Sequence, residues 1–561
     1  MFRGGRRLIG AGIVLSAGIG FVTSRYRTPK YDYIVVGAGS GGCVTAYFLA
    51  KWLEPTGRTV LLLDSGDSFS DDPKMSEWFE NWGKRAIAHE TYSENASFLP
   101  AVASSHNGVG GCSTHDTRIT YIPTNEQANR MANLMNWSRA DFDMYLQTVL
   151  NMIPLQSAGT GHERFYDAII DTLDQHSQIK KVNGDGDYKA RILPNTAGYV
   201  SIAMFTDELR WSQAYLLEDA PKNLTVLKNT LVDKIIFDKH LKATSVVSSK
   251  GRHHQASTEI IITAGSLGTP GILQRSGIGP RAVLEPLGVK VLVPNDEVGH
   301  GVDHAEVPVM YSWLDKWKEL DGQLPRGGPM AWPLALFFEN GTTNIMAHFG
   351  ISPPPYGGNE VTGTPNCSNP DPKDGFYAQI VSKNPLDPVR VVHKDSPHDF
   401  AVLASGVRKM VAAFEVLREH GIVGDRVSPP KLLDINSDEH LDLWCRTHLG
   451  TAYHWMSTTR ATKDGTGVVD ENFKVRGVHG LRVGSGAVLP EITEANPHLT
   501  IAAFSTALAW TIVSQTQSEL PYDLWLARQQ IGKNQGVVIR SAAELSLNLS
   551  SIAQQHCAKN D

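Results

Sequence analysis

One short stretch constrains the fold of this chain more than any other. Residues 31–36 form an apolar, β-rich run, and the glycine-rich turn GAGSGG follows it directly. An apolar-periodic segment, CVTAYFLAKWL, comes next, and then a second apolar run, RTVLLLD, which ends at Asp64. Strand, glycine turn, helix and strand in this order predict a βαβ unit of a parallel sheet.

The glycines of this turn have the spacing of a dinucleotide site. Gly37, Gly39 and Gly42 fit the pattern GxGxxG. The first allows a tight turn, the second lets the backbone approach a pyrophosphate, and the third lets helix and strand pack closely. The pyrophosphate then meets the free N–H groups and the dipole of the helix N-terminus. Asp64 is placed to bind ribose hydroxyls, so we predict a bound dinucleotide.

Composition sets the remaining limits. A length of 561 residues predicts two or more domains. The net charge of −6, without a basic patch in the body of the chain, argues against a nucleic-acid partner. The five cysteines include no CxxC pair, so neither a zinc site nor a disulfide scaffold is expected, and we predict no metal site.

The N-terminus differs from the rest of the chain. Arg3, Arg6 and Arg7 precede an apolar run that extends from Leu8 to Val22, and further basic residues follow it. This run falls just below the usual spanning length of roughly 17–25 residues. A signal peptide, a signal anchor and an organelle presequence all fit. We expect residues 1–30 to lie outside the fold and to direct the protein to a membrane, a mitochondrion or the secretory route.

The remaining chain alternates strand-like and loop-like stretches. Residues 220–265 are predicted to hold several strands, and residues 401–420 a helix. Residues 320–375 are rich in proline and glycine and are predicted to form long loops of a second domain. Near the C-terminus, the strand-like GLRVGSGAVLP precedes NPHLTIAAFSTALAWTIV, a loop that opens a long apolar helix.

Three stretches, taken as a set, resemble the glucose–methanol–choline flavin oxidoreductases, and in particular the choline-oxidising members. They are the GxGxxG unit, GSLGTPGILQRSGIGP at residues 265–280, and AYHWMST together with GLRVGSGAVLPEITEANPHLT. The resemblance spans most of residues 31–515. It implies an α/β fold with a doubly wound FAD-binding domain and an antiparallel-sheet substrate domain. It also implies bound FAD, with cofactor contacts at Val232, Gly486 and Pro497.

The resemblance also divides the chain. Residues 31–300 and 446–516 are assigned to the FAD domain, which is built from separated segments. Residues 301–445 form the main part of the substrate domain, and further pieces of it lie near residues 150–215. Residues 517–561 are a C-terminal extension beyond the match.

The loop GGCSTHDTRITYIP becomes informative within this family. The usual form is GGSS followed by an asparagine, whereas GGCSTH resembles the choline-oxidising members, in which the histidine is bonded to the 8-methyl group of the flavin. His115 occupies that place. A neutral imidazole can attack the electrophilic methyl position of oxidised flavin. We expect Gly110 and Gly111 to bring the backbone close to the flavin and His115 to form the bond.

The same loop departs from the family beside this histidine. Asp116 replaces the usual asparagine, and Thr117, which we place among the substrate contacts, replaces a serine. An acid near the flavin repels its anionic reduced form unless it is paired or protonated. We count Asp116 as a cofactor contact. A second departure is Ser485, where the family usually has an acid.

Two histidines are the predicted catalytic pair. Oxidation of an alcohol needs a base for the hydroxyl proton and a donor for the developing alkoxide. His454 takes the place of the family's catalytic histidine, and an imidazole with a near-neutral pKa suits that work. His498 takes the place of a second residue, which is histidine in the glucose-oxidising members and asparagine in the choline-oxidising ones.

The predicted substrate is choline or a similar quaternary ammonium alcohol. Glu306, in DHAE, falls where the choline-oxidising members place a glutamate against the trimethylammonium group. A buried carboxylate beside a fixed cation offsets the desolvation of both. Aromatic walls add cation–π contacts of about 0.5–2 kcal/mol each. Trp78, Trp332 and Tyr453 are the candidates for these walls.

Several hypotheses about the substrate, the electron acceptor and the reaction remain. The reaction yields an aldehyde and, after hydration, an acid, and the electrons pass to dioxygen or to a quinone-type acceptor. Alternatives are an aryl or long-chain alcohol, a lyase with a structural flavin, and a fatty acid photodecarboxylase. The oligomeric state is not predicted.

Overall fold

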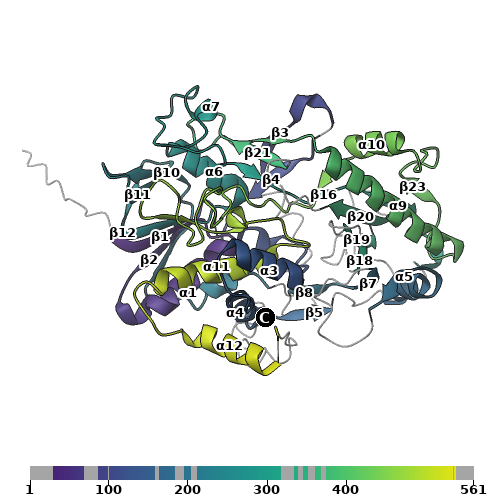
Figure 1. The fold of residues 1–561 in the computed structure, drawn as a ribbon, viewed down its shortest axis with the longest axis horizontal. Helices are drawn as coiled ribbons and strands as arrows, with labels where there is room; N and C mark the ends of the chain where they lie inside the picture. The colour runs from purple at the N-terminus through teal and green to yellow at the C-terminus, as the bar shows by residue number, and fades with distance from the viewer. Residues whose placement is uncertain are drawn as a thin grey trace, which may run out of the picture.

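The computed structural model describes residues 30–67, 86–98, 100–157, 163–182, 195–203, 211–317, 334–338, 345–351, 360–367, 375–534 and 536–537. Trp78, Trp332 and the N-terminal targeting segment up to residue 29 lie outside these residues. Figure 1 shows two parts side by side, one built on a largely parallel sheet with α1 and α11, the other on a second sheet crossed by α9. The predicted α/β fold is confirmed.

The first part contains the predicted βαβ unit. Within the described residues, seven strands form one sheet in the order β10-β11-β12-β1-β2-β9, and β25 pairs with β12. β1 is parallel to both β2 and β12. The strands are β1 (Lys30–Val36), β2 (Val60–Leu63), β9 (Leu224–Leu227), β10 (Val232–Phe237), β11 (Ala243–Ser248), β12 (His253–Ile262) and β25 (Leu481–Val483).

Helices cover this sheet and bury its apolar side chains. α1 packs on α11, α11 on α4, and α4 on α12. α11 is apolar on nearly every side, which explains why it is buried almost throughout. The helices of this part are α1 (Ser40–Leu53), α3 (Asn125–Leu134), α4 (Arg139–Leu150), α6 (Gly265–Arg275), α7 (Arg281–Leu284), α11 (His498–Val513) and α12 (Tyr522–Asn534).

The second part is built on a mostly antiparallel sheet. Among the described residues, its order is β23-β17-β20-β19-β18-β7-β6, and β16 joins it together with β24. α9 (Pro397–Glu419) crosses β20 (Figure 1), and α5 (Glu163–His176) and α10 (Asp438–Thr447) pack against α9. The strands are β6 (Lys180–Lys181), β7 (Thr196–Tyr199), β16 (Ala305–Glu306), β17 (Val309–Ser312), β18 (Leu334–Phe338), β19 (Ile345–Ile351), β20 (Glu360–Cys367), β23 (Arg426–Ser428) and β24 (Gly450–Thr451).

The prediction of long loops over residues 320–375 is wrong in part. β18, β19 and β20 lie in this stretch and pair with one another as antiparallel neighbours. The runs LALFF and IMAHFGI carry enough apolar residues for a sheet that packs on α9. The prolines and glycines of this stretch therefore do not prevent strand formation. Pro365 itself lies within β20, opposite Ala347.

A smaller sheet and a few short pairs complete the fold. In the order β15-β21-β22-β3-β4, the segment before the Gly110 loop contributes β3 and β4, and β3 pairs with β22. Its strands are β3 (Ala86–Ser93), β4 (Ala103–His106), β15 (His300–Gly301), β21 (Phe376–Gln379) and β22 (Arg390–His393). β5 (Leu155–Ser157) pairs with β8 (Ser201–Ala203), and β13 (Ile278–Gly279) with β14 (Val293–Pro294). In the described part of the chain, no helix has the length and apolar character needed to cross a membrane.

Candidate active site

Two of the three motif glycines are required by close packing. Gly37 has φ of +102°, and a Cβ there would lie 2.7 Å from the carbonyl oxygen of Thr263. A Cβ on Gly42 would lie 1.8 Å from the carbonyl oxygen of Gly37. These positions therefore accept only glycine, because backbone atoms occupy the place of any side chain.

Gly39 is different, because it borders a hollow. The nearest atom to a Cβ at this position is 3.9 Å away, the Cα of Gly111. Gly39 is also the N-cap of α1, and no side chain caps the helix. The bare N–H groups and the open space together fit a pyrophosphate.

Asp64 holds the glycine turn in place. Its carboxylate accepts the N–H of Ala38 at 2.7 Å and the N–H of Gly66 at 2.8 Å. The carboxylate thus fixes the geometry of the turn. Its contact with a ribose stays a prediction.

The Gly110–Gly111 pair closes the other side of the hollow. Gly110, with φ of +93°, donates its N–H to the carbonyl of Ala38 at 2.7 Å. A Cβ on Gly111 would lie 2.7 Å from the Cα of Gly39. The two glycine-rich segments therefore touch, although more than seventy residues separate them by their numbering.

His115 follows this pair and is buried. Its ring lies against the ring of His106, with centroids 3.8 Å apart. The backbone N–H of His115 donates to the carbonyl of Cys112 at 3.0 Å, so the short 3₁₀ turn Gly111–Thr114 fixes its position. Asp116 directs one oxygen to the N–H of Arg118 at 3.0 Å, which gives its negative charge a backbone donor. Thr117 is only partly exposed beside it.

Three further predicted cofactor positions fall at element ends. Gly486 begins a 3₁₀ turn after β25, and the preceding Ser485 lies so near α1 that a Cβ on Gly41 would be 2.8 Å from its Cα. Pro497 is the N-cap of α11. Val232 opens β10 at the end of the sheet order. Gly486 is thus placed near the glycine turn, and the roles of Val232 and Pro497 stay predictions.

The DHAE and GTAYH segments form one ribbon. Ala305 and Glu306 of β16 pair with Thr451 and Gly450 of β24. Asp303, which precedes β16, accepts the hydroxyl of Thr451 in β24 and, at 2.8 Å, the backbone N–H of His454. The predicted substrate carboxylate and the predicted base are therefore held by the same pair of segments.

A hydrogen-bond chain determines that Nδ1 of His454 carries a hydrogen. His304 Nε2 lies 2.7 Å from the carbonyl of Thr493, and since a carbonyl only accepts, this nitrogen carries hydrogen. Burial lowers the pKa of His304 to about 4, so its ring is neutral and its Nδ1 accepts. His454 Nδ1 lies 2.8 Å from that atom and must donate.

The lone pair of neutral His454 is therefore on Nε2. Asn496 places its amide nitrogen 3.2 Å from this atom, as a donor to it. His454 as a whole is only partly buried. This arrangement makes Nε2 the basic atom.

His498 stands at the first position of α11, two residues after Asn496. Its Nε2 contacts the side-chain amide of Gln213, and the backbone N–H of Gln213 donates to Ser113 Oγ at 3.3 Å. Ser113 belongs to the GGCST loop. Gln213 thus links this loop to His498, and Asn496 brings His454 to the same segment.

Glu306 is a desolvated carboxyl group. Burial, with a smaller contribution from the charge of Asp303, raises its pKa to about 8. Burial likewise raises the pKa of Asp303 to about 7, against three hydrogen bonds that favour its ionised form. Both groups are placed to gain from a cation nearby. Tyr453, at φ of +59°, is 39% exposed and lies between them and His454 in the chain.

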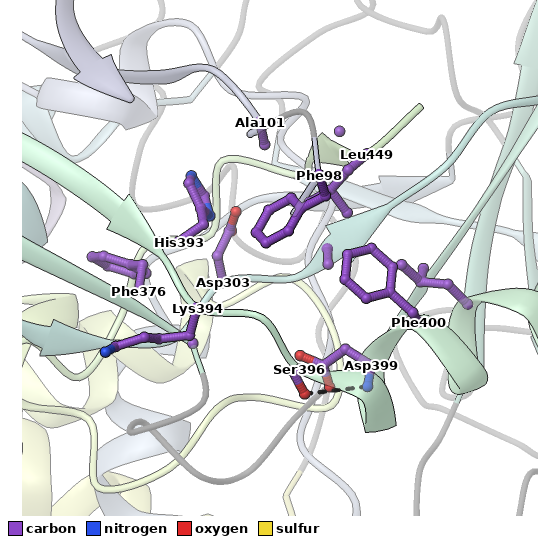
Figure 2. Close-up of a pocket in the computed structure, with 14 residues that line it drawn as sticks. Phe98, Ala101, Asp303, Phe376, His393, Lys394, Ser396, Asp399, Phe400 and Leu449 are labelled. Atoms are coloured by element: carbon purple, nitrogen blue, oxygen red, sulfur yellow. Dashed lines mark hydrogen bonds between the residues drawn. The ribbon is translucent and has the colours of Figure 1, made fainter. Parts of the chain in front are cut away.

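A pocket reaches this ribbon from the side of α9. Figure 2 shows Asp303, His393 and Phe98 lining it from three separate segments. Phe98 packs edge-on against Phe400 of α9, with ring centroids 5.4 Å apart. Burial lowers the pKa of His393 to about 4, so this side chain is neutral. Lys394 and Asp399 also line the pocket, which therefore offers a partly aromatic and partly charged approach to Asp303.

The sequence did not identify four residues of this arrangement: Asp303, His304, Asn496 and Gln213. Asp303 and His304 stand in DHAE beside the predicted Glu306, and Asn496 stands in NPH beside the predicted His498. Their position as polar neighbours of predicted site residues could have identified them. Gln213 carried no such signal, because its role depends on a contact with a segment 285 positions away. Among the described residues, no cluster of histidine, cysteine and acidic side chains could hold a metal ion.

Sequence comparison identifies the family. The N-terminal profile of the GMC oxidoreductases matches residues 31–303, and the C-terminal profile matches residues 377–505. The chain belongs to the GMC oxidoreductases, and it is an FAD-dependent enzyme that oxidises an alcohol and passes electrons to an acceptor.

Individual relatives agree with this assignment. Choline oxidase from Arthrobacter globiformis is 25% identical over 553 residues, which cover 87% of this chain and 95% of the relative. Oxygen-dependent choline dehydrogenase from Pectobacterium carotovorum is 25% identical and covers 86% of this chain and 94% of its own.

Solved structures support the fold. A formate oxidase variant from Aspergillus oryzae, 17% identical, aligns with a TM-score of 0.74 over 87% of this chain and 99% of its own. Pyridoxine 4-oxidase from Mesorbium loti, also 17% identical, aligns with a TM-score of 0.72 over 88% of this chain and 100% of its own.

The residues present fit FAD. Gly39 leaves a hollow at an uncapped helix N-terminus, and the GGCST loop closes over it. Near the histidines, Asn496 Oδ1 and Gln213 Oε1 are buried without a hydrogen-bond partner among the described residues. Buried polar atoms normally have partners, so a polar group is expected to complete this region.

Proposed function

We propose that this enzyme oxidises choline, or a closely similar quaternary ammonium alcohol, to the aldehyde, and on to the betaine acid once the aldehyde is hydrated. The observation that carries the proposal is the ribbon that joins Glu306 to His454. It holds a carboxyl group suited to a cation and a base suited to a hydroxyl on the same two segments.

His454 takes the hydroxyl proton in this proposal. Its Nδ1 hydrogen is engaged by His304, so Nε2 accepts the proton as the alkoxide develops. His498, at the positive end of α11, stabilises that alkoxide. FAD, held by the glycine turn and the GGCST loop, supplies the hydride acceptor.

Glu306 selects the cation. A permanent positive charge beside it restores the ionised carboxylate that burial disfavours. Tyr453 is the described aromatic candidate for a cation–π contact, and Trp78, Trp332 and Thr117 complete the proposed substrate contacts. A neutral alcohol gains nothing from this carboxyl group.

We further propose that His115 bonds covalently to FAD and that dioxygen reoxidises the flavin. The loop geometry supports the first part, since the 3₁₀ turn fixes His115 just after the glycine pair that closes the hollow. The names of the relatives, an oxidase and oxygen-dependent dehydrogenases, support the second.

Anaerobic titration of the purified enzyme with choline tests the substrate. Bleaching of the flavin absorbance at stoichiometric choline is the expected result. Flavin that stays oxidised with choline but bleaches with an aryl or long-chain alcohol contradicts the proposed substrate. Turnover that leaves the flavin oxidised throughout indicates a lyase, and turnover only in light indicates a photodecarboxylase. Oxygen uptake compared with reduction of a quinone analogue identifies the acceptor.

We also propose that the segment of residues 1–30 carries a membrane or organelle address. Its basic flanks and apolar centre support this proposal. Fractionation of cells that express the full chain or a chain starting at Lys30 tests it. Identical distributions of the two chains contradict the proposal.

A further inference from the structure

A second histidine lies against the proposed flavin tether. The rings of His106 and His115 have centroids 3.8 Å apart and planes inclined by 52°. Both side chains are at least partly buried. The pair is separated by nine positions in the chain, so the contact results from the fold of the loop between them.

The loop that pairs the rings is tightly constrained. Gly108, Gly110 and Gly111 all have positive φ, at +133°, +93° and +52°, which reverses the chain between the two histidines. His106 ends β4 and is paired with Ala86 of β3, while the side chain of Ser65 donates to Asn107 Oδ1 at 2.7 Å. His106 is therefore anchored by β4, and His115 by the 3₁₀ turn that precedes it.

The charge state of such a pair is restricted. Two imidazolium rings in contact repel strongly, so the pair favours states that hold at most one extra proton. When one ring carries a proton, the other stays neutral and keeps a lone pair. When both rings are neutral, one can act as the nucleophile while the other accepts its proton, and the pair then holds that single extra proton.

We propose that His106 accepts the imidazole proton while His115 becomes bonded to FAD. This inference rests on the proposed covalent bond at His115. The bond joins a nitrogen of His115 to the 8-methyl carbon of FAD, and the methyl group loses one hydrogen and the imidazole another. Two electrons remain on the flavin, and dioxygen removes them together with two protons as hydrogen peroxide. His106 holds the imidazole proton between these steps and keeps the His115 ring in position.

The test uses the full chain purified with its FAD. The fraction of polypeptide that carries covalent FAD is measured by intact mass under denaturing conditions, at increasing times of aerobic incubation. His106→Phe keeps an aromatic ring of similar size without a proton acceptor. We expect it to bind FAD, as its visible absorbance reports, and to attach it more slowly by roughly tenfold or more.

Chemical rescue and controls make the role specific. Added imidazole should restore fast attachment in His106→Ala, which leaves space for it, and not in His106→Phe. His176 lies against His420 in a similar ring pair, with centroids 3.9 Å apart, remote in sequence from the glycine loops, so His176→Phe should attach FAD like the wild type. His115→Ala should carry no covalent FAD.

The outcomes separate the two proposals. Equal attachment in His106→Phe and the wild type, or a lack of rescue in His106→Ala, overturns the role of His106 and leaves the His115 bond intact. A wild type without covalent FAD overturns the His115 bond, and the role of His106 with it.

Discussion

At the scale of single residues, the tautomer of His454 is the most consequential feature of the site. It is set by the carbonyl of Thr493, which acts through His304. Because neutral His304 carries its hydrogen on Nε2, its Nδ1 can only accept, and His454 must donate to it from Nδ1. In the proposed reaction, the nitrogen that accepts the proton is thus selected before the substrate binds.

Replacing His454 by alanine should therefore remove the proton acceptor and little else. We expect kcat/KM for choline to fall by about 10²- to 10⁴-fold, the usual contribution of a general base. Flavin content should stay near that of the wild type, since the glycine cradle is untouched. Stopped-flow measurement of anaerobic flavin reduction checks the loss, and an unchanged reduction rate would assign the proton to another group.

Glu306 predicts a pH dependence of substrate binding. Its pKa of about 8 in the free protein means that the carboxyl group is mostly neutral at pH 7 and ionised above pH 8. A permanent cation binds the ionised form, so KM for choline should fall as the pH rises towards 8 and then level off. Steady-state kinetics between pH 6 and about 9.5 measure this change.

The matched variant is Glu306→Gln. It should raise KM for choline on the order of a hundredfold and remove the contribution of this group to the pH dependence, because an amide offers no charge. Dimethylbutanol, the neutral isostere of choline, should bind both proteins alike. Equal losses for both alcohols would show that Glu306 supports the fold rather than the cation.

At the scale of elements, different glycines of the glycine turn are expected to serve packing and cofactor binding. Gly39→Ala places a methyl group in the hollow, 3.9 Å from the nearest protein atom, so the apoprotein should keep its Tm. FAD content, read from visible absorbance, should fall because the methyl group competes with the pyrophosphate.

Gly42→Ala is the contrasting variant. Its Cβ would lie 1.8 Å from the carbonyl oxygen of Gly37, so the strand and helix must move apart. Overpacking of this kind typically costs about 1–3 kcal/mol, and a lowered apoprotein Tm is expected. Equal Tm values for the two variants would contradict the assignment of packing to Gly42 and of binding to Gly39.

The same elements show how far the sequence could lead. The βαβ unit was predictable because its strands, turn and helix are local and each carries its own periodicity. The pairing of DHAE with GTAYH was not, since it joins residues about 150 positions apart and leaves no periodic trace. β18, β19 and β20 were not predicted because the many prolines and glycines of this stretch indicated loops, although apolar runs typical of strands lie between them. His454 and Glu306 were predicted through resemblance, whereas the contact between their segments is visible only in the folded chain.

At the scale of the whole molecule, the site depends on segments from most of the chain. His454 meets His304 across 150 positions, and His498 meets Gln213 across 285. No single segment can hold this geometry alone, so catalysis is expected to disappear as the two sheets separate. The helical layer of α1, α4, α11 and α12 is what keeps the N-terminus of α11 fixed against the first sheet.

α12 closes this layer and gives a test of it. Leu524 and Ala527 are fully buried, and Asp523 accepts hydrogen bonds from Lys51 at 3.0 Å and from Trp52 Nε1 at 3.1 Å. Burial of a leucine side chain contributes about 1.5–3 kcal/mol, whereas a partly exposed ion pair contributes up to about 1 kcal/mol. A chain that ends at Pro521 should therefore lose roughly 5 °C in Tm, and Asp523→Ala much less. A chain that ends at Val537 keeps α12 and is the control. An unchanged Tm without α12 would mean that α4 and α11 hold the layer by themselves.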